Sequence, residues 1–100
     1  MPYIIQFIDD AATQRKHKTS IRPIHVEYVA KNAHRIIASG GFFPEDDDFP
    51  NGGLIILDAD SYDQAVEYIE NDPFFKNGIF SKYTITRWTK FIFDHKRVIS

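Results

Sequence analysis

Cysteine is absent from the 100 residues of this chain. Its absence excludes disulfide bonds, catalysis by a thiolate and metal sites that depend on thiolates. No apolar run approaches the roughly 20 residues that a helix needs to span a bilayer, and the first residues lack the basic segment of a secretory signal. We therefore expect a protein of the cytoplasm that does not associate with membranes.

An excess of basic residues is missing as well. The chain has 12 Lys and Arg against 14 Asp and Glu, which gives a formal net charge of −2. Because a nucleic-acid partner would require a basic surface to contact phosphates, we expect no such partner. The short basic run at residues 15–18 is predicted to be a solvated connection.

Typical metal and phosphate sites are also missing. The acidic cluster at residues 45–48 lacks the glycine and the distal glutamate of a calcium loop, so a solvated loop is favoured. His17, His34 and His95 show no spacing typical of metal ligands and are expected at the surface. No glycine-rich phosphate loop follows a predicted strand. We expect that the protein uses neither a metal nor an organic cofactor.

Apolar side chains, in contrast, are abundant. Hydrophobic residues make up 43% of the chain and aromatic residues 15%, which is ample for a folded interior. At this length we expect one compact domain over residues 1–100, in which residues 89–100 form a C-terminal extension.

The first half of the chain predicts a strand and a helix. Residues 3–8 are β-branched and aromatic, as is typical of a strand. Residues 11–21 favour neither a short helix nor a loop. Ser20 precedes a segment with Pro23 in its first turn, which indicates a helix start. That helix is expected to continue to a stop at residues 39–41.

The second half predicts three strands and another helix. A second strand is expected to begin at residues 42–43, and the apolar run at residues 54–57 indicates a central third strand. Ser61 is a sound N-cap for the second helix, which Pro73 ends through its effect on the residue before it. Residues 79–93 then predict one long strand.

The predicted order of elements is strand, helix, strand, strand, helix, strand. With right-handed crossovers, this order gives an α+β, ferredoxin-like βαββαβ fold, in which both helices cover one face of a four-stranded antiparallel sheet. An apolar sheet face rarely stays in water, so we expect a homodimer that packs sheet against sheet. The last strand is expected to place five apolar residues on one face: Ile79, Tyr83, Ile85, Phe91 and Phe93.

A histidine and an aspartate on different helices form the candidate site. A carboxylate that faces the imidazole of His25 would fix its tautomer and raise its basicity, as general acid–base chemistry requires. Asp72 could supply that carboxylate, and Phe74 and Phe75 could wall an apolar pocket around it. Arg22 could hold an anionic or phenolic oxygen. The alternatives are a partly buried structural histidine, an aspartate that only bonds backbone amides, and a surface arginine.

Several short motifs follow one another in a fixed order: Arg22-Pro23-x-His25, Gly40-Gly41-Phe42-Phe43, Gly52-Gly53, Ser61-x-x-x-Ala65, Asp72-Pro73-Phe74 and Ile85-x-x-Trp88. Together they resemble the YCII-related (YciI-like) family over nearly the whole chain. The resemblance implies a dimeric α+β barrel with an active-site histidine and aspartate, which correspond to His25 and Asp72. Arg22 matches the arginine one turn before that histidine. This chain departs from the family in having Leu54 where many members have serine, and in extending beyond the usual end.

The resemblance leaves more than one function open. Most family members have no assigned reaction, and one relative is a dehydrochlorinase of chlorinated hydroxyquinols. Our first hypothesis is a lyase or isomerase in which His25 moves a proton on a small molecule, Asp72 orients the imidazole and Arg22 holds an oxygen. Phe74 and Phe75 would exclude water. The alternative is a non-catalytic metabolite-binding or structural dimeric module, and a cofactor-free monooxygenase rests on superfamily likeness alone.

Overall fold

The computed structural model describes residues 1–10 and 15–98 of the chain. No helix in this part of the chain is both long and apolar enough to cross a membrane. The elements, in order, are β1 (Pro2–Ile8), α1 (Arg15–Lys31), η2 (Ala33–Arg35), β2 (Ile36–Phe42), β3 (Gly52–Asp58), α2 (Tyr62–Glu70), α3 (Pro73–Lys76), β4 (Tyr83–Arg87), β5 (Ile92–Phe93) and β6 (Lys96–Arg97).

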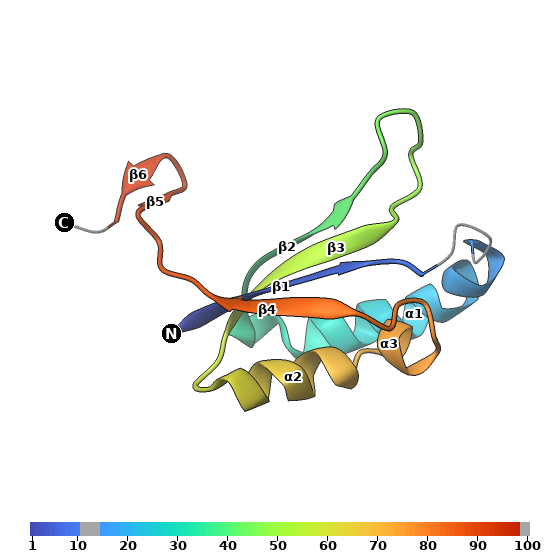
Figure 1. Cartoon of the computed structure of the whole chain (residues 1–100), viewed down its shortest axis with the longest axis horizontal. Coiled ribbons are helices and arrows are strands. Elements are labelled where there is room, and N and C mark those ends of the chain that lie inside the picture. Colours follow the sequence, from blue (N-terminus) through green and yellow to red (C-terminus); the bar gives the residue numbers. More distant parts are fainter. Residues whose placement is uncertain (11–14, 99–100) are drawn as a thin grey trace.

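Four strands form one antiparallel sheet in the order β2-β3-β1-β4. β1 lies between two neighbours, so that Ile5 is opposite Ile55 on β3 and opposite Ile85 on β4. The α-helices all lie on the same side of this sheet (Figure 1). This arrangement is ferredoxin-like, and the prediction of an α+β fold with helices on one face is confirmed.

The core lies between the sheet and the helices because successive side chains of a strand point to opposite faces. On β1, Ile5 and Phe7 are buried, whereas Gln6 between them is exposed. α2 contributes Tyr68 and Ile69, whose side chains are almost completely inaccessible to solvent. A cavity can therefore form between the helices and this face of the sheet.

Two N-caps organise the chain after β3. The Ser61 hydroxyl accepts a hydrogen bond from the N–H of Gln64 at 3.2 Å, which confirms the predicted start of α2. α2 ends at Glu70, and Asp72 then caps the short helix α3, in which Pro73 is the first residue. Asp72-Pro73 therefore follows the end of α2 and also begins α3.

α1 begins earlier than the sequence pattern predicts. The expected start at Ser20 is wrong, because residues 15–21 are already helical and Pro23 lies inside the helix. Residues 11–14, the rest of the segment for which the sequence favours neither a helix nor a loop, lie outside the described residues. Proline has no N–H for the carbonyl of Thr19, but Thr19 is exposed and water can bond that carbonyl.

α1 also ends earlier than predicted. The expected stop at residues 39–41 is wrong, as is a second strand that begins at residue 42, because β2 already occupies residues 36–42. Ile36 and Ile37 are β-branched and favour a strand. The glycines that suggested a helix stop instead pair with β3, where Gly41 is opposite Gly53.

The long strand predicted for residues 79–93 is also wrong. Only β4, the middle of this segment, pairs with the sheet. The chain turns at Gly78, whose φ is +76°, and the N–H of Ile79 bonds the carbonyl of Phe74 at 2.9 Å. Ile79 and Phe80 are therefore buried in the core, where Phe80 stacks on Phe7 of β1, and do not extend the strand.

The apolar face predicted for that strand does not form. Tyr83 and Ile85 pack against the core, while Phe91 and Phe93 belong to the segment around the β5–β6 hairpin, which stands away from the sheet (Figure 1). The sheet face away from the helices instead carries alternate apolar residues of the two central strands: Ile4, Ile8, Leu54 and Ile56.

Gly52 and Gly40 offer a matched test of packing between strands. A Cβ at Gly52 would lie 2.4 Å from the main-chain oxygen of Phe7, whereas a Cβ at Gly40 would have nothing within 4 Å. We expect Gly52→Ala to lower the free energy of unfolding by about 1–3 kcal/mol and Gly40→Ala to change it by less than about 0.5 kcal/mol. Urea denaturation followed by the fluorescence of Trp88 measures both, and equal effects would contradict the expectation.

Candidate active site

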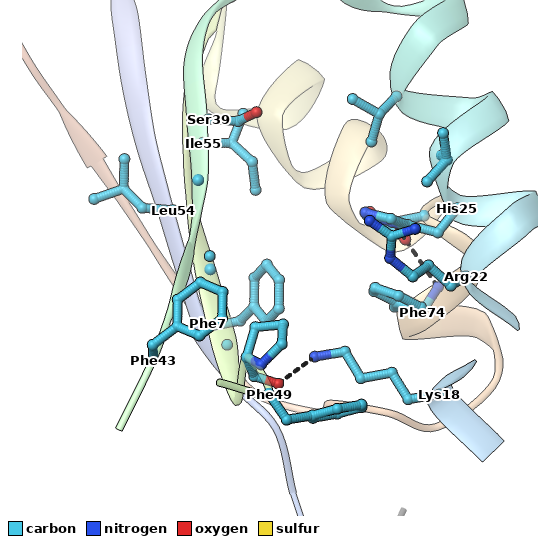
Figure 2. A pocket seen from close by; sticks show the side chains of 18 of the residues that line it. Phe7, Lys18, Arg22, His25, Ser39, Phe43, Phe49, Leu54, Ile55 and Phe74 are labelled. Atoms are coloured by element: carbon cyan, nitrogen blue, oxygen red, sulfur yellow. Dashed lines mark hydrogen bonds and ion pairs between the residues drawn. The ribbon is translucent and has the colours of Figure 1, made fainter. Parts of the chain in front are cut away.

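A cavity of about 510 Å³ lies between α1 and the helix-covered face of the sheet (Figure 2). α1 contributes residues spaced so that they share one face of the helix, namely Lys18, Arg22, His25 and Val29. The opposite wall comes from the sheet and the loop between β2 and β3, with Phe7, Phe43, Phe49, Gly53 and Ile55.

Asp72 holds two parts of the site together. Its side chain is 1% exposed, and its Oδ1 accepts a hydrogen bond from the N–H of Phe74 at 2.8 Å. This is the N-cap bond of α3 that Asp-Pro sequences commonly form. The same oxygen lies 2.9 Å from Nδ1 of His25, on α1. The helix-capping role and the pairing with histidine therefore occur together at one atom.

His25 is held on two sides. Its ring is stacked on the ring of Phe74, with centroids 4.0 Å apart and planes 8° from parallel. Because an ionised carboxylate can only accept, Nδ1 donates to Asp72 and carries the hydrogen. Nε2 makes no hydrogen bond with any residue that the structure describes. The imidazole thus has a fixed orientation and one nitrogen that is free to act on a ligand.

The remaining predicted site residues divide into two groups. Arg22 and Phe74 both line the cavity, and within residues 1–10 and 15–98 Arg22 has no ion-pair partner. Phe75 does not line the cavity, contrary to expectation, because its ring packs against Phe80 and Tyr83. Neighbouring residues of a short helix point in different directions, so only one of the two phenylalanines can face His25.

Tyr68 also lines the cavity, although an aromatic residue at this spacing is more typical of a core or an interface. It is 1% exposed, and its hydroxyl has no hydrogen-bond partner among the described residues. Burial, together with the nearby carboxylate of Asp72, raises the pKa of Tyr68, so the group stays protonated. Burial also raises the pKa of Tyr28, to about 12. Tyr28 differs from Tyr68 in that its hydroxyl donates a hydrogen bond, to the Tyr68 carbonyl at 2.6 Å.

Lys18 is a cavity residue that the sequence pattern did not indicate. The prediction that residues 15–18 are a solvated connection is wrong, since they open α1 and Lys18 is only 6% exposed. Its Nζ donates to Oδ2 of Asp9 at 2.6 Å and to the carbonyl of Pro50 at 2.9 Å. A helix that starts at residue 15 would place Lys18 on the same face as His25, which is the signal that could have identified it.

The acidic loop and the other histidines lie outside the cavity. In the acidic loop, Asp47 pairs with Arg15 and caps the N–H of Phe49. His17 and His34 are exposed, as expected, and His17 bonds the carbonyl of Asn77. Over residues 1–10 and 15–98, no three histidine, cysteine or acidic side chains come together as a metal site would require.

The chain was compared with known families and structures. The model of the YCII-related domain matches residues 1–89. Among solved structures, the chain is similar to 5-chloro-2-hydroxyhydroquinone dehydrochlorinase from Burkholderia phenoliruptrix AC1100 in complex with 2,5-dihydroxybenzoquinone. The TM-score is 0.79 at 25% sequence identity, and the alignment covers 96% of this chain and 99% of that one. No curated protein matches the sequence significantly. The family match extends over most of the chain, which therefore belongs to the YCII-related domain family.

Proposed function

We propose that this protein is a small-molecule enzyme of the lyase or isomerase type that moves a proton with His25. The observation that carries the proposal is the 2.9 Å contact between His25 Nδ1 and Asp72 Oδ1 at the wall of a mostly apolar cavity. Asp72 would orient the imidazole and stabilise its protonated form, and Nε2 would accept and return the proton. Low polarity around the pair would strengthen this interaction.

A flat, oxygenated ring is the substrate class that we propose. The similar dehydrochlorinase was solved with 2,5-dihydroxybenzoquinone, a ligand of this kind, and the cavity volume of about 510 Å³ suits a small ring compound. The guanidinium of Arg22 would bind one of the ring oxygens. The Tyr68 hydroxyl, which stays protonated, would donate a hydrogen bond to another.

Loss of HCl from a chlorinated hydroquinone illustrates the chemistry. A proton first moves from a ring hydroxyl to the carbon that bears chlorine, which gives a keto tautomer. A second hydroxyl then loses its proton while chloride departs with the electron pair of the C–Cl bond, leaving a quinone. His25 would carry the protons in both steps, and neither step requires a metal or an organic cofactor.

His25→Ala and Asp72→Asn test the proposed base and its partner. We expect each variant to lower chloride release from 5-chloro-2-hydroxyhydroquinone by about 100-fold or more. Asp72→Asn should remain folded because an amide oxygen can still cap α3. If neither variant changes turnover, or if the ring ¹⁵N resonances of His25 are the same in wild type and Asp72→Asn, the pair is structural and the proposed mechanism is wrong. A wild type that binds the ring compound without turnover would favour the non-catalytic module.

Tyr68→Phe and Tyr28→Phe separate ligand binding from stability. Removing the Tyr68 hydroxyl, which has no described partner, should leave the free energy of unfolding unchanged or higher and weaken binding of 2,5-dihydroxybenzoquinone about 10-fold. Removing the Tyr28 hydroxyl breaks a formed hydrogen bond, so it should cost about 1 kcal/mol of stability without affecting binding. Thermal melts and titration calorimetry measure the two effects. The opposite pattern would assign Tyr68 to the core alone.

We also propose that two copies pair through the sheet face away from the helices. The helices cover only one face (Figure 1), and the other carries the cross-strand pair Ile4 and Ile56 at its centre. Ile8, on the same face, is 57% exposed. Burial of this surface against a second copy would remove apolar area from water.

Ile56→Lys tests the proposed homodimer. Wild-type protein should elute with about twice the chain mass of 11.6 kDa in light-scattering chromatography. A lysine at the centre of the interface should give a folded monomer, because its charge would be buried without a partner. Ala30→Lys adds the same charge on the exposed side of α1 and should leave the dimer intact. A monomeric wild type would refute the pairing.

A further inference from the structure

Lys18 is an unusual lysine because it is buried and yet lines the cavity. Only 6% of the residue is exposed, and Nζ donates hydrogen bonds to Asp9 and to the carbonyl of Pro50. Figure 2 shows the second of these bonds but does not draw Asp9. The same nitrogen lies 5.6 Å from the ring centre of Phe49 and 5.3 Å from that of Phe74. The ammonium group is thus fixed between two acceptors and two aromatic rings.

Stability alone explains this arrangement poorly. Removing two charges from water costs more than a buried ion pair usually returns, so an apolar pair of the same volume would serve the fold equally well. The two charges are also oriented: Lys18 lines the cavity, whereas Asp9 does not. The pair therefore presents its positive end to the cavity.

Lys18 still has a hydrogen to donate. An ammonium group carries three N–H donors, and the described residues accept two hydrogen bonds from Nζ. Burial and the two anchoring bonds hold the lysine in one geometry, so little side-chain entropy would be lost when a ligand accepts the third. An oxyanion is the acceptor that such a donor favours most, since a hydrogen bond between two charged groups is the stronger kind.

Lys18 and His25 line the same cavity. They are seven residues apart on α1 and therefore share a face of the helix. Both also lie against Phe74, whose ring centre is 4.0 Å from that of His25 and 5.3 Å from the Lys18 ammonium. The ammonium group and the imidazole ring centre therefore lie less than about 10 Å apart, a distance that a substituted aromatic ring can bridge.

We infer that Lys18, positioned by Asp9, is a binding residue for an anionic oxygen of the ligand, remote from the atom that His25 deprotonates. The ligand class is then a planar ring with at least two oxygen substituents, of which one is ionised at neutral pH. The inference rests on the proposed function for the ring-shaped ligand, but anion binding at Lys18 requires no proton transfer. Arg22, which is exposed, would assist at the cavity mouth.

Lys18→Met tests the inference, with Lys16→Met as its matched control. Lys16 lies on α1 but is exposed and outside the cavity, so both variants lose one positive charge. The probes are 2,5-dihydroxybenzoquinone, which is an anion at neutral pH, and the neutral 2,5-dimethylbenzoquinone. Calorimetry should show that Lys18→Met binds the anion about 10- to 100-fold more weakly and the neutral ring with unchanged affinity. Lys16→Met should match wild type for both.

A second measurement uses the wild-type protein, since Lys18→Met leaves Asp9 buried without its partner and could unfold. With ¹⁵N-labelled lysine, the Nζ resonance of Lys18 should shift on addition of the anionic probe and not of the neutral one. An unshifted resonance, or a wild type that does not prefer the anion, overturns the inference. If His25→Ala abolishes turnover while the Lys18 shift persists, both proposals stand. If turnover is independent of His25 while the shift persists, only the proton-transfer mechanism fails.

Discussion

One carboxylate oxygen holds the proposed site and part of the fold in place. Asp72 Oδ1 accepts the N–H of Phe74 and faces Nδ1 of His25. A carboxylate that is almost completely buried needs such partners, because an unpaired charge in the interior is very costly. Through these two contacts, the start of α3 and one face of α1 are fixed relative to each other, and the ring of Phe74 is placed against the imidazole.

The cavity has a polar group at each of two ends. His25 and Asp72 form one end, and Lys18 with Asp9 forms the other, while the walls between them are mostly apolar and aromatic. In such surroundings each hydrogen bond is stronger than in water, and each unpaired polar group is more costly. These physical properties suit a small ring with oxygen substituents better than an extended or fully apolar ligand.

Local chemistry explains which elements the sequence predicted well. Ser61 caps α2 as expected because capping involves residues three apart, and the alternation along β1 is visible in any short window. Pro23 misled the prediction of α1, since proline usually marks a first turn but lies here in the interior. The glycines of β2 misled in the same way, because only their pairing with β3 identifies them as strand residues.

Local patterns along the chain specify the order of the four sheet strands and the two long helices, and with it the α+β fold and the two residues of the candidate pair. Three other features became visible only in the folded chain: His25 and Asp72, 47 residues apart, are in contact, Lys18 is buried against Pro50, and Phe75 turns away from the cavity. The reason is that local patterns fix the backbone of each element, whereas distances between elements follow from how their apolar faces pack.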